Sequence, residues 1–195
     1  MKIAIKKIGI LFFLSMVFAG CSSPNPPPMA TCNTVGTPFQ LLATSLLAST
    51  MPIYGTTVTM DLNTHEYTFK LLANKTVCSI GYQNQGGYTG QYLMKISQGT
   101  TVLYSGNLSF VSTGTVFVPI TPVALTAGVT YTISRTLLSG TTLSHQLGKA
   151  LSMASGSVVP FPVTDGNMTI LSSTFYGAGG PVNNNVIPYI DFGTY

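Results

Sequence analysis

Short runs in which apolar and polar residues alternate are the feature that most restricts how this chain can fold. The segment HEYTFKLL places Tyr67, Phe69 and Leu71 on one side of an extended chain, and residues 129–138, VTYTISRTLL, repeat the pattern. Alternation with period two indicates a strand with one buried face. Several such runs, spaced roughly 8–12 residues apart, indicate an all-β sandwich or barrel. We therefore expect an antiparallel, jelly-roll-like β-sandwich with about 8–10 strands and little helix.

Helical patterns are few. Residues 39–49, FQLLATSLLAS, carry apolar residues at near-helical spacing, although the same run is compatible with a strand. Residues 145–153, HQLGKALSM, contain a central glycine, which costs a helix about 1 kcal/mol. Turn signals at Asp165-Gly166 and at residues 183–185 separate further strand-like runs. We therefore expect at most one or two short turns of helix.

The first 20 residues have the pattern of an export signal. Three lysines precede an apolar run of about 12 residues, which is shorter than the roughly 20 residues of a membrane-spanning helix. The small residues Ala19 and Gly20 then stand directly before Cys21. This arrangement resembles a bacterial lipoprotein signal. The resemblance implies cleavage after Gly20 and attachment of palmitate-like acyl chains to Cys21, which anchor the mature protein to a membrane.

A proline-rich segment follows the cysteine, and we assign residues 21–31 to a lipidated cysteine and its tether. Proline-rich segments are extended, semi-rigid spacers. Residues 32–195 are predicted to form a single β-sandwich domain, because a mature chain of about 175 residues is long enough for one sizeable core. The order of segments predicts a location in the bacterial cell envelope, facing the periplasm or the exterior.

The charge of the mature chain excludes nucleic-acid binding. The whole chain has 8 basic and 4 acidic residues, but three of the lysines lie in the leader. The remaining basic residues are scattered along the sequence. Nucleic-acid binding needs clustered positive charge that neutralises phosphates, so we expect no nucleic-acid partner.

Two cysteines remain once Cys21 is assigned to lipid. Cys32 and Cys78 can pair in an exported protein, and the loop that they would close predicts a stabilisation of about 4 kcal/mol. The alternative is two buried thiols. We favour the disulfide because Cys32 stands near the start of the domain, where a bridge would hold the terminus.

Two motifs lie within residues 86–136. One is the turn GTTVL at 99–103, and the other is PVALTAG at 122–128, which is followed by Tyr131. In the second motif, Leu125 would face the core and Gly128 would permit a turn before Tyr131 begins a strand. Together they resemble a domain family of unknown function found on bacterial extracellular proteins. The resemblance implies a jelly-roll-like sandwich with an accessory extracellular role and no known chemistry.

The most suggestive candidate for ligand binding is the segment GYQNQGGYTGQY at 81–92. Tyrosines offer a flat apolar face and a hydroxyl, and amides both donate and accept hydrogen bonds, a combination that suits sugars. The alternative is an ordinary connection between strands, with Tyr82 and Tyr92 in the core and Tyr88 exposed. The absence of tryptophan argues against a dedicated sugar platform. The candidate ligand-binding residues are Tyr82, Gln83, Asn84, Gln85, Tyr88, Gln91 and Tyr92.

Catalytic and metal-binding patterns are weak, and we assign neither a catalytic residue nor a cofactor. The candidate acids and bases are few and lack a recognisable motif such as the nucleophile elbow of hydrolases. Asp61 and Asn63 resemble the start of a calcium loop, but the glycine and final glutamate of an EF-hand are missing. Apart from Asp61, the candidate acids and bases of the mature chain are Glu66, Asp165, Asp191, His65 and His145.

These observations predict a cell-envelope lipoprotein whose non-catalytic β-sandwich has a binding or structural role. One alternative is a carbohydrate-binding module that uses the tyrosine and amide segment. Another is a surface assembly or adhesion protein that uses the edge or the face of a sheet. The expected partners are the lipid bilayer, through the acylated N-terminus, and a glycan or a surface protein.

Overall fold

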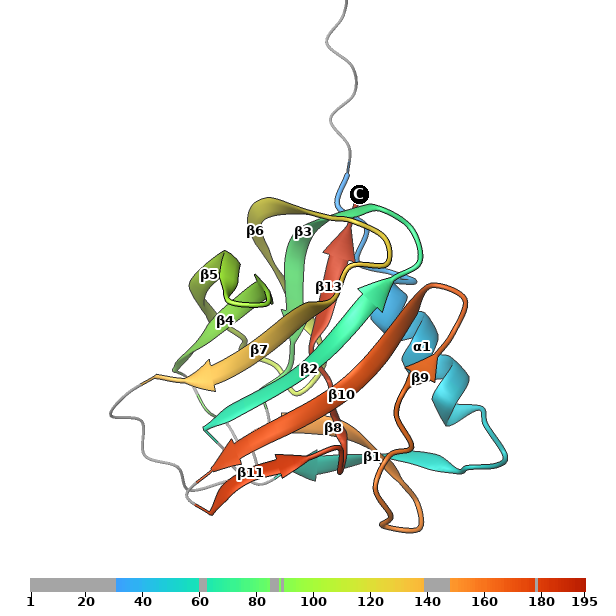
Figure 1. The fold of residues 1–195 in the computed structure, drawn as a ribbon. Coiled ribbons are helices and arrows are strands. Elements are labelled where there is room, and N and C mark those ends of the chain that lie inside the picture. The colour runs from blue at the N-terminus through green and yellow to red at the C-terminus, as the bar shows by residue number, and fades with distance from the viewer. Residues whose placement is uncertain (1–30, 60–62, 85–87, 89, 139–147, 178) are drawn as a thin grey trace, which may run out of the picture.

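The chain folds into antiparallel β-sheets with one short helix in the computed structural model, which describes residues 31–59, 63–84, 88, 90–138, 148–177 and 179–195 (Figure 1). The predicted all-β sandwich is confirmed. The elements are α1 (Pro38–Leu47), β1 (Tyr54–Thr59), β2 (Thr64–Leu71), β3 (Lys75–Tyr82), β4 (Gln91–Gln98), β5 (Thr101–Ser109), β6 (Val116–Leu125), β7 (Tyr131–Leu137), β8 (Gly148–Met153), β9 (Val163–Thr164), β10 (Met168–Gly177), β11 (Gly180–Asn183), β12 (Ile187–Pro188) and β13 (Asp191–Thr194). The described residues form 13 strands, more than the expected 8–10. Part of the excess comes from β9 and β12, which have only two residues each, too few to show alternation.

One large sheet and two small sheets form the sandwich. The large sheet has the order β11-β10-β2-β7-β4-β5, with β9 paired to β10. The small sheets have the orders β13-β3-β6 and β1-β8-β12. In Figure 1 both small sheets lie behind the large one, the first behind β7 and β2 and the second behind β10. The side chains between these layers therefore form the core.

The alternation that predicted the strands also defines the core. Along β2 every second residue is buried, and Tyr67, Phe69 and Leu71 all face inward. Phe69 stacks on Phe192 of β13 with ring centroids 5.3 Å apart, which joins the two layers. Burying one such side chain contributes about 1.5–3 kcal/mol. The buried residues of both layers belong to one hydrophobic cluster.

Of the two helix candidates, the first forms a helix that is longer than the expected one or two turns, and the described residues of the second form a strand. Residues 38–47 form α1, in which Pro38 opens the first turn and Thr37 caps it by accepting a hydrogen bond from the Gln40 backbone N–H at 3.1 Å. Residues 148–153, by contrast, form strand β8 rather than helix. The physical reason is the pairing of β8 with β1 over six residues, together with the helix-breaking Gly148.

The start of the described chain is fastened to the domain in two places. A disulfide joins Cys32 to Cys78 of β3, with their Cα atoms 5.8 Å apart. Asn33 pairs with Thr194 of β13 through backbone hydrogen bonds of 2.9 and 3.1 Å. These contacts hold residues 32–33 at one end of the sandwich, which we call the N-terminal end and which also contains Tyr195 (Figure 1).

We call the opposite end of the sandwich the loop end. Strands β3 and β7 end there, and strands β2, β4 and β8 begin there. The tyrosine and amide segment lies there. Cys21 and the whole leader and tether up to residue 30 lie outside the described residues. Within the described part of the chain, no helix is long and apolar enough to cross a membrane.

Candidate functional site

The tyrosine and amide segment lies at the loop end, but most of its side chains point into the protein. Tyr82, Gln83 and Tyr92 are fully buried, and Asn84 is only 4% exposed. Strands β3 and β4 position these residues, because Tyr82 ends the first and Tyr92 is the second residue of the other. Four of the seven residues predicted to bind ligand therefore form no exposed platform for a sugar.

The other predicted residues of this segment have different surroundings. Tyr88 is half-buried, and its ring lies against that of Tyr92 with centroids 4.9 Å apart. Its hydroxyl donates to the backbone carbonyl of Gln91 at 3.2 Å. The Gln91 side chain is exposed, and Gln85 lies outside the described residues. Tyr88 and Gln91 thus remain available as surface contacts at the loop end.

Below this segment the aromatic rings form a connected cluster. The ring of Tyr82 makes edge contacts with Tyr92 and Phe110, with centroids 5.3 and 5.5 Å apart. The hydroxyl of Tyr92 donates to the amide oxygen of Asn84 at 3.2 Å, and the Asn84 backbone N–H donates to the Ser112 carbonyl at 2.7 Å. These contacts join the β3–β4 connection to the β5–β6 connection.

A fully buried arginine lies in the middle of the cluster. The Nε of Arg135 donates to the Tyr82 hydroxyl at 3.1 Å, and its Nη2 donates to Nδ1 of His65 at 2.9 Å. The guanidinium carbon also lies 5.6 Å from the Tyr82 ring centroid and 5.1 Å from that of Tyr92. Cation–π contacts of this kind contribute about 2 kcal/mol when desolvated. A charge removed from water needs such partners, because burial alone costs several kcal/mol.

His65 is held as a neutral hydrogen-bond acceptor by its surroundings. A guanidinium has only donors, so the ring nitrogen that faces Arg135 must be unprotonated. Burial lowers the pKa of His65 well below its usual value, and the charge of Arg135 lowers this pKa further. The imidazole also lies against the ring of Phe175 at a centroid distance of 4.5 Å. His65 is therefore a poor candidate for a proton donor near neutral pH.

Two further residues show how tightly this end is packed. A Cβ atom on Gly148 would lie 2.8 Å from the Tyr82 hydroxyl and 2.9 Å from Cε1 of His65, so only glycine fits there. The side-chain amide of Gln83 is buried, and within the described part of the chain neither its nitrogen nor its oxygen has a hydrogen-bond partner. Such a group costs about 1–3 kcal/mol. A buried polar cluster that costs stability is a typical mark of a functional end of a domain.

Sequence reasoning missed the centre of this cluster, although a signal was present. Arg135 is two residues beyond Ile133 and four beyond Tyr131, so it lies on the same inward face of β7. His65 likewise precedes Tyr67 by two residues on the inward face of β2. Extending the period-two pattern by two residues, forward from Ile133 and backward from Tyr67, would have placed both residues inside the protein.

A second buried polar group is Asp191 of β13. One carboxylate oxygen accepts from the Thr37 hydroxyl at 2.6 Å and from the Phe192 backbone N–H at 2.7 Å, and the other accepts from the Gln40 amide at 2.8 Å. Thr37 is also the cap of α1. This carboxylate therefore fixes the helix to the last strand and has no free side from which to attack a substrate.

Burial raises the pKa of Asp191 to about 6, against the opposing effect of its three hydrogen bonds. Between pH 4 and 6 the folded protein keeps this proton, whereas the unfolded chain loses it, so the Asp191 contribution to stability falls as pH rises. Each tenfold change in proton affinity is worth about 1.4 kcal/mol, which predicts a loss of about 3 kcal/mol across this window. His65 acts in the opposite direction, because its lowered pKa costs stability as pH falls below 6.5.

Comparing the wild type with Asp191→Asn separates the two effects. We expect the free energy of unfolding of the variant minus that of the wild type to rise by about 3 kcal/mol as the pH is raised from 3.5 to 7. Urea unfolding at a series of pH values measures this difference. Lost hydrogen bonds would shift the whole curve of the variant without changing this pH dependence. Asp165→Asn, in an exposed turn, is the control and should follow the wild type. Parallel curves for wild type and Asp191→Asn would contradict the prediction.

The remaining acidic residues lie apart from one another. Glu66, on β2, accepts a hydrogen bond from the Tyr176 hydroxyl at 3.2 Å, while Asp165 accepts from the Asn167 backbone N–H at 2.8 Å in a turn. Asn63 of the predicted calcium site is exposed, and its partner Asp61 lies outside the described residues, as does His145. Among the residues that the structure describes, no three His, Cys, Asp or Glu side chains are grouped as a metal site.

No family model matches the chain, and no curated protein matches it.

Proposed function

We propose that this chain is a lipoprotein of the bacterial cell envelope, facing the periplasm or the exterior, with a non-catalytic β-sandwich that has a binding or structural role. The observation that carries the proposal is the order of segments. An export-like leader ends at Cys21, a proline-rich stretch follows, and a folded domain begins within the next dozen residues or so. The resemblance of residues 86–136 to an extracellular domain family of unknown function is consistent with this location.

The disulfide supports an exported location. Disulfides persist in the periplasm and outside the cell and are rare in the reducing cytosol. The Cys32–Cys78 bridge lies directly after the tether, where it joins residue 32 to β3. A pull on the anchored N-terminus would therefore act on a covalent link to the sandwich rather than on a loose end.

A binding or structural role is supported by the way in which the described acids and bases are used. Asp191 holds α1 to β13, and His65 accepts a hydrogen bond from Arg135 inside the core. Glu66 and Asp165 lie on separate elements. Hydrolases of sugars need two carboxylates within about 5–9.5 Å that face one cleft, and these contacts give the described carboxylates other roles.

The lipid anchor is tested by replacing Cys21. Cys21→Ser removes the thiol that would carry the diacylglyceryl group, so we expect the variant to lose labelled palmitate and to leave the membrane fraction. Ser23→Ala, two residues away, keeps the thiol and should behave as the wild type. If Cys21→Ser incorporated palmitate normally and remained with the membrane, the anchor would be ruled out.

Carbohydrate binding at the loop end is a second candidate. The observation in its favour is that Tyr88, which is partly exposed and whose ring lies tilted against that of Tyr92, is close in sequence to the exposed Gln91 side chain. Stacking on an aromatic ring together with amide hydrogen bonds is how proteins commonly contact sugars. This site would lie at the opposite end of the sandwich from residue 32, and therefore away from the anchor.

A glycan array with the wild type and Tyr88→Ala tests this candidate. Loss of one apolar ring contact predicts a fall in affinity of roughly tenfold or more. Tyr195→Ala, at the N-terminal end and 46% exposed, is the control and should bind as the wild type does. No binding to any glycan, or binding that Tyr88→Ala leaves unchanged, would remove this candidate.

A further inference from the structure

The strand edges of this sandwich differ in how well they are protected. An exposed edge presents unpaired backbone N–H and C=O groups, and proteins usually protect it with proline, charge, bulges, shortness or a covering segment. In the large sheet, β11 has four residues and contains Pro181, while the register of β5 with β4 is shifted at Leu103 of β5, and β5 also contacts β6. Both edges of that sheet are therefore protected.

The small sheets have three protected edges. β6 contains Pro119 and Pro122, and its register with β3 is broken by a bulge. β13 is bridged by Asn33 and contacts α1. β12 has only two residues, one of them Pro188.

Strand β1 is the exception. Its six residues, YGTTVT, contain no proline and no charge, and they pair with β8 in unbroken register from Tyr54–Met153 to Thr59–Gly148. Among the described residues, β8 is the only strand that pairs with β1, and α1 contacts β1 without pairing with it. In Figure 1 β1 lies on the lower side of the molecule, whereas β13, which Asn33 bridges, ends at the top beside the C-terminus. An anchor at the N-terminal end would thus leave this edge free.

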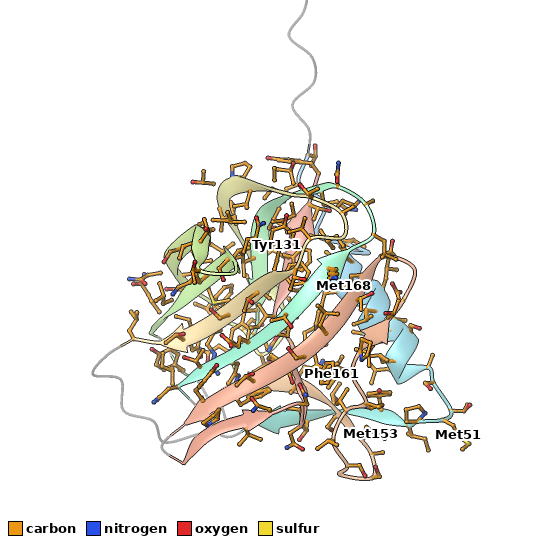
Figure 2. All side chains as sticks on the ribbon, in the orientation of Figure 1. Met51, Tyr131, Met153, Phe161 and Met168 are labelled. Carbon is orange, nitrogen blue, oxygen red and sulfur yellow. A yellow bond between two sulfur atoms is a disulfide. The ribbon has the colours of Figure 1, made fainter. Side chains whose placement is uncertain are left out.

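Apolar side chains are exposed on and beside this edge. Met51 is 89% exposed, Ile53 58% and Val58 37%. Figure 2 shows Met51 near Met153, and the Ala154 backbone N–H donates to the Ile53 carbonyl at 2.9 Å, which holds this segment at the end of β8. An unprotected edge flanked by exposed apolar residues is a typical surface for adding a strand.

We propose that β1 pairs antiparallel with β1 of a second copy of this chain, so that the two small sheets β1-β8-β12 become one continuous six-stranded sheet. The charge pattern favours a second copy. In a twofold pair, a charge near the middle of the strand would face or neighbour its own copy and repel it, and residues 51–59 carry no charge. Self-pairing also needs no separate partner, and it covers the edge backbone groups of both copies. The pairing does not depend on the lipid anchor.

Cysteine cross-linking in the full-length exported chain tests the pairing. In the proposed pair the twofold axis passes through Thr56 or Thr57, at the middle of β1, so one of these two residues faces its own copy. We expect Thr56→Cys or Thr57→Cys to form a disulfide-linked band of about twice the 20.6 kDa chain mass on a non-reducing gel. Thr101→Cys, an exposed threonine on the β5 edge, is the matched control and should remain a monomer.

Charge exchange then tests whether the partner is another copy. If Thr56→Cys is the variant that cross-links, we expect adding Thr57→Lys or Thr57→Glu to it to abolish the dimer band, and co-expression of the lysine and glutamate forms to restore the band. If Thr57→Cys is the variant that cross-links, the lysine and the glutamate are placed at Thr56 instead. The monomer band reports that the variants still accumulate. No dimer band from either cysteine, a band equally strong from Thr101→Cys, or a band that single charges leave unchanged would each overturn the proposal.

Discussion

Replacing Arg135 by alanine is expected to lower the free energy of unfolding by about 3–5 kcal/mol, the loss typical of truncating a large, fully buried side chain. The substitution removes the guanidinium that bonds the Tyr82 hydroxyl and the His65 ring, and it opens a cavity beside Tyr92. Urea unfolding measures the change. In a thermal melt the midpoint should fall by about 2–4 °C for each kcal/mol lost.

A lysine on the neighbouring strand provides the matched control. Lys95 of β4 pairs with Ser134 of β7 and is half-buried rather than enclosed. Lys95→Ala should change the free energy of unfolding by no more than about 0.5 kcal/mol. Arg135→Met keeps most of the volume without the charge, so it should lose less than Arg135→Ala. If Arg135→Ala were as stable as Lys95→Ala, the buried cluster would not be what holds the loop end together.

Removing the disulfide is expected to have an effect of similar size. Cys32 and Cys78 are 46 residues apart in the sequence, and opening a loop of that length gives the unfolded chain entropy worth about 4 kcal/mol. The Cys32→Ala/Cys78→Ala double variant should therefore unfold at a lower urea concentration by that amount. Residues 32 and 33 should also become accessible to proteases, because only the Asn33–Thr194 bridge would then hold them.

Reduction of the wild type supplies an independent measurement. Enough reductant to expose two alkylatable thiols should lower the stability of the wild type to that of the double variant, and the same reductant should leave the double variant unchanged. A wild type whose unfolding midpoint did not move after both thiols had been labelled would contradict the prediction.

The fold could be predicted from the sequence wherever a strand is long and has one buried face. In β2, the period-two spacing of Tyr67, Phe69 and Leu71 was enough, because one face meets the core. The two-residue strands β9 and β12 could not be seen, because two residues show no period. Residues 148–153 were misassigned for a different reason. Their pairing with β1, almost a hundred residues earlier in the chain, decides their conformation, and local propensity does not report it.

The candidate site was predicted in its location and missed in its chemistry. Tyr82 and Tyr92 were named as ligand-binding candidates and, in the alternative, as core residues; their rings turn inward onto Arg135, as the alternative expected. A charged residue is so seldom buried that composition alone assigns it to the surface. The pairing of Arg135 with His65 depends on β7 lying beside β2, and this adjacency is a property of the topology that no local pattern contains.

The last strand, β13, has a consequence for when the chain can fold. Phe192 lies in the core, Asp191 holds α1, and Thr194 binds Asn33 near the beginning of the domain. A growing polypeptide that has not yet reached these residues lacks the backbone partner of Asn33 and a complete inner layer. The core of the domain can therefore be completed only after β13 has been made. Under the proposed export of this chain, such late completion would suit passage through a translocation channel in an unfolded state.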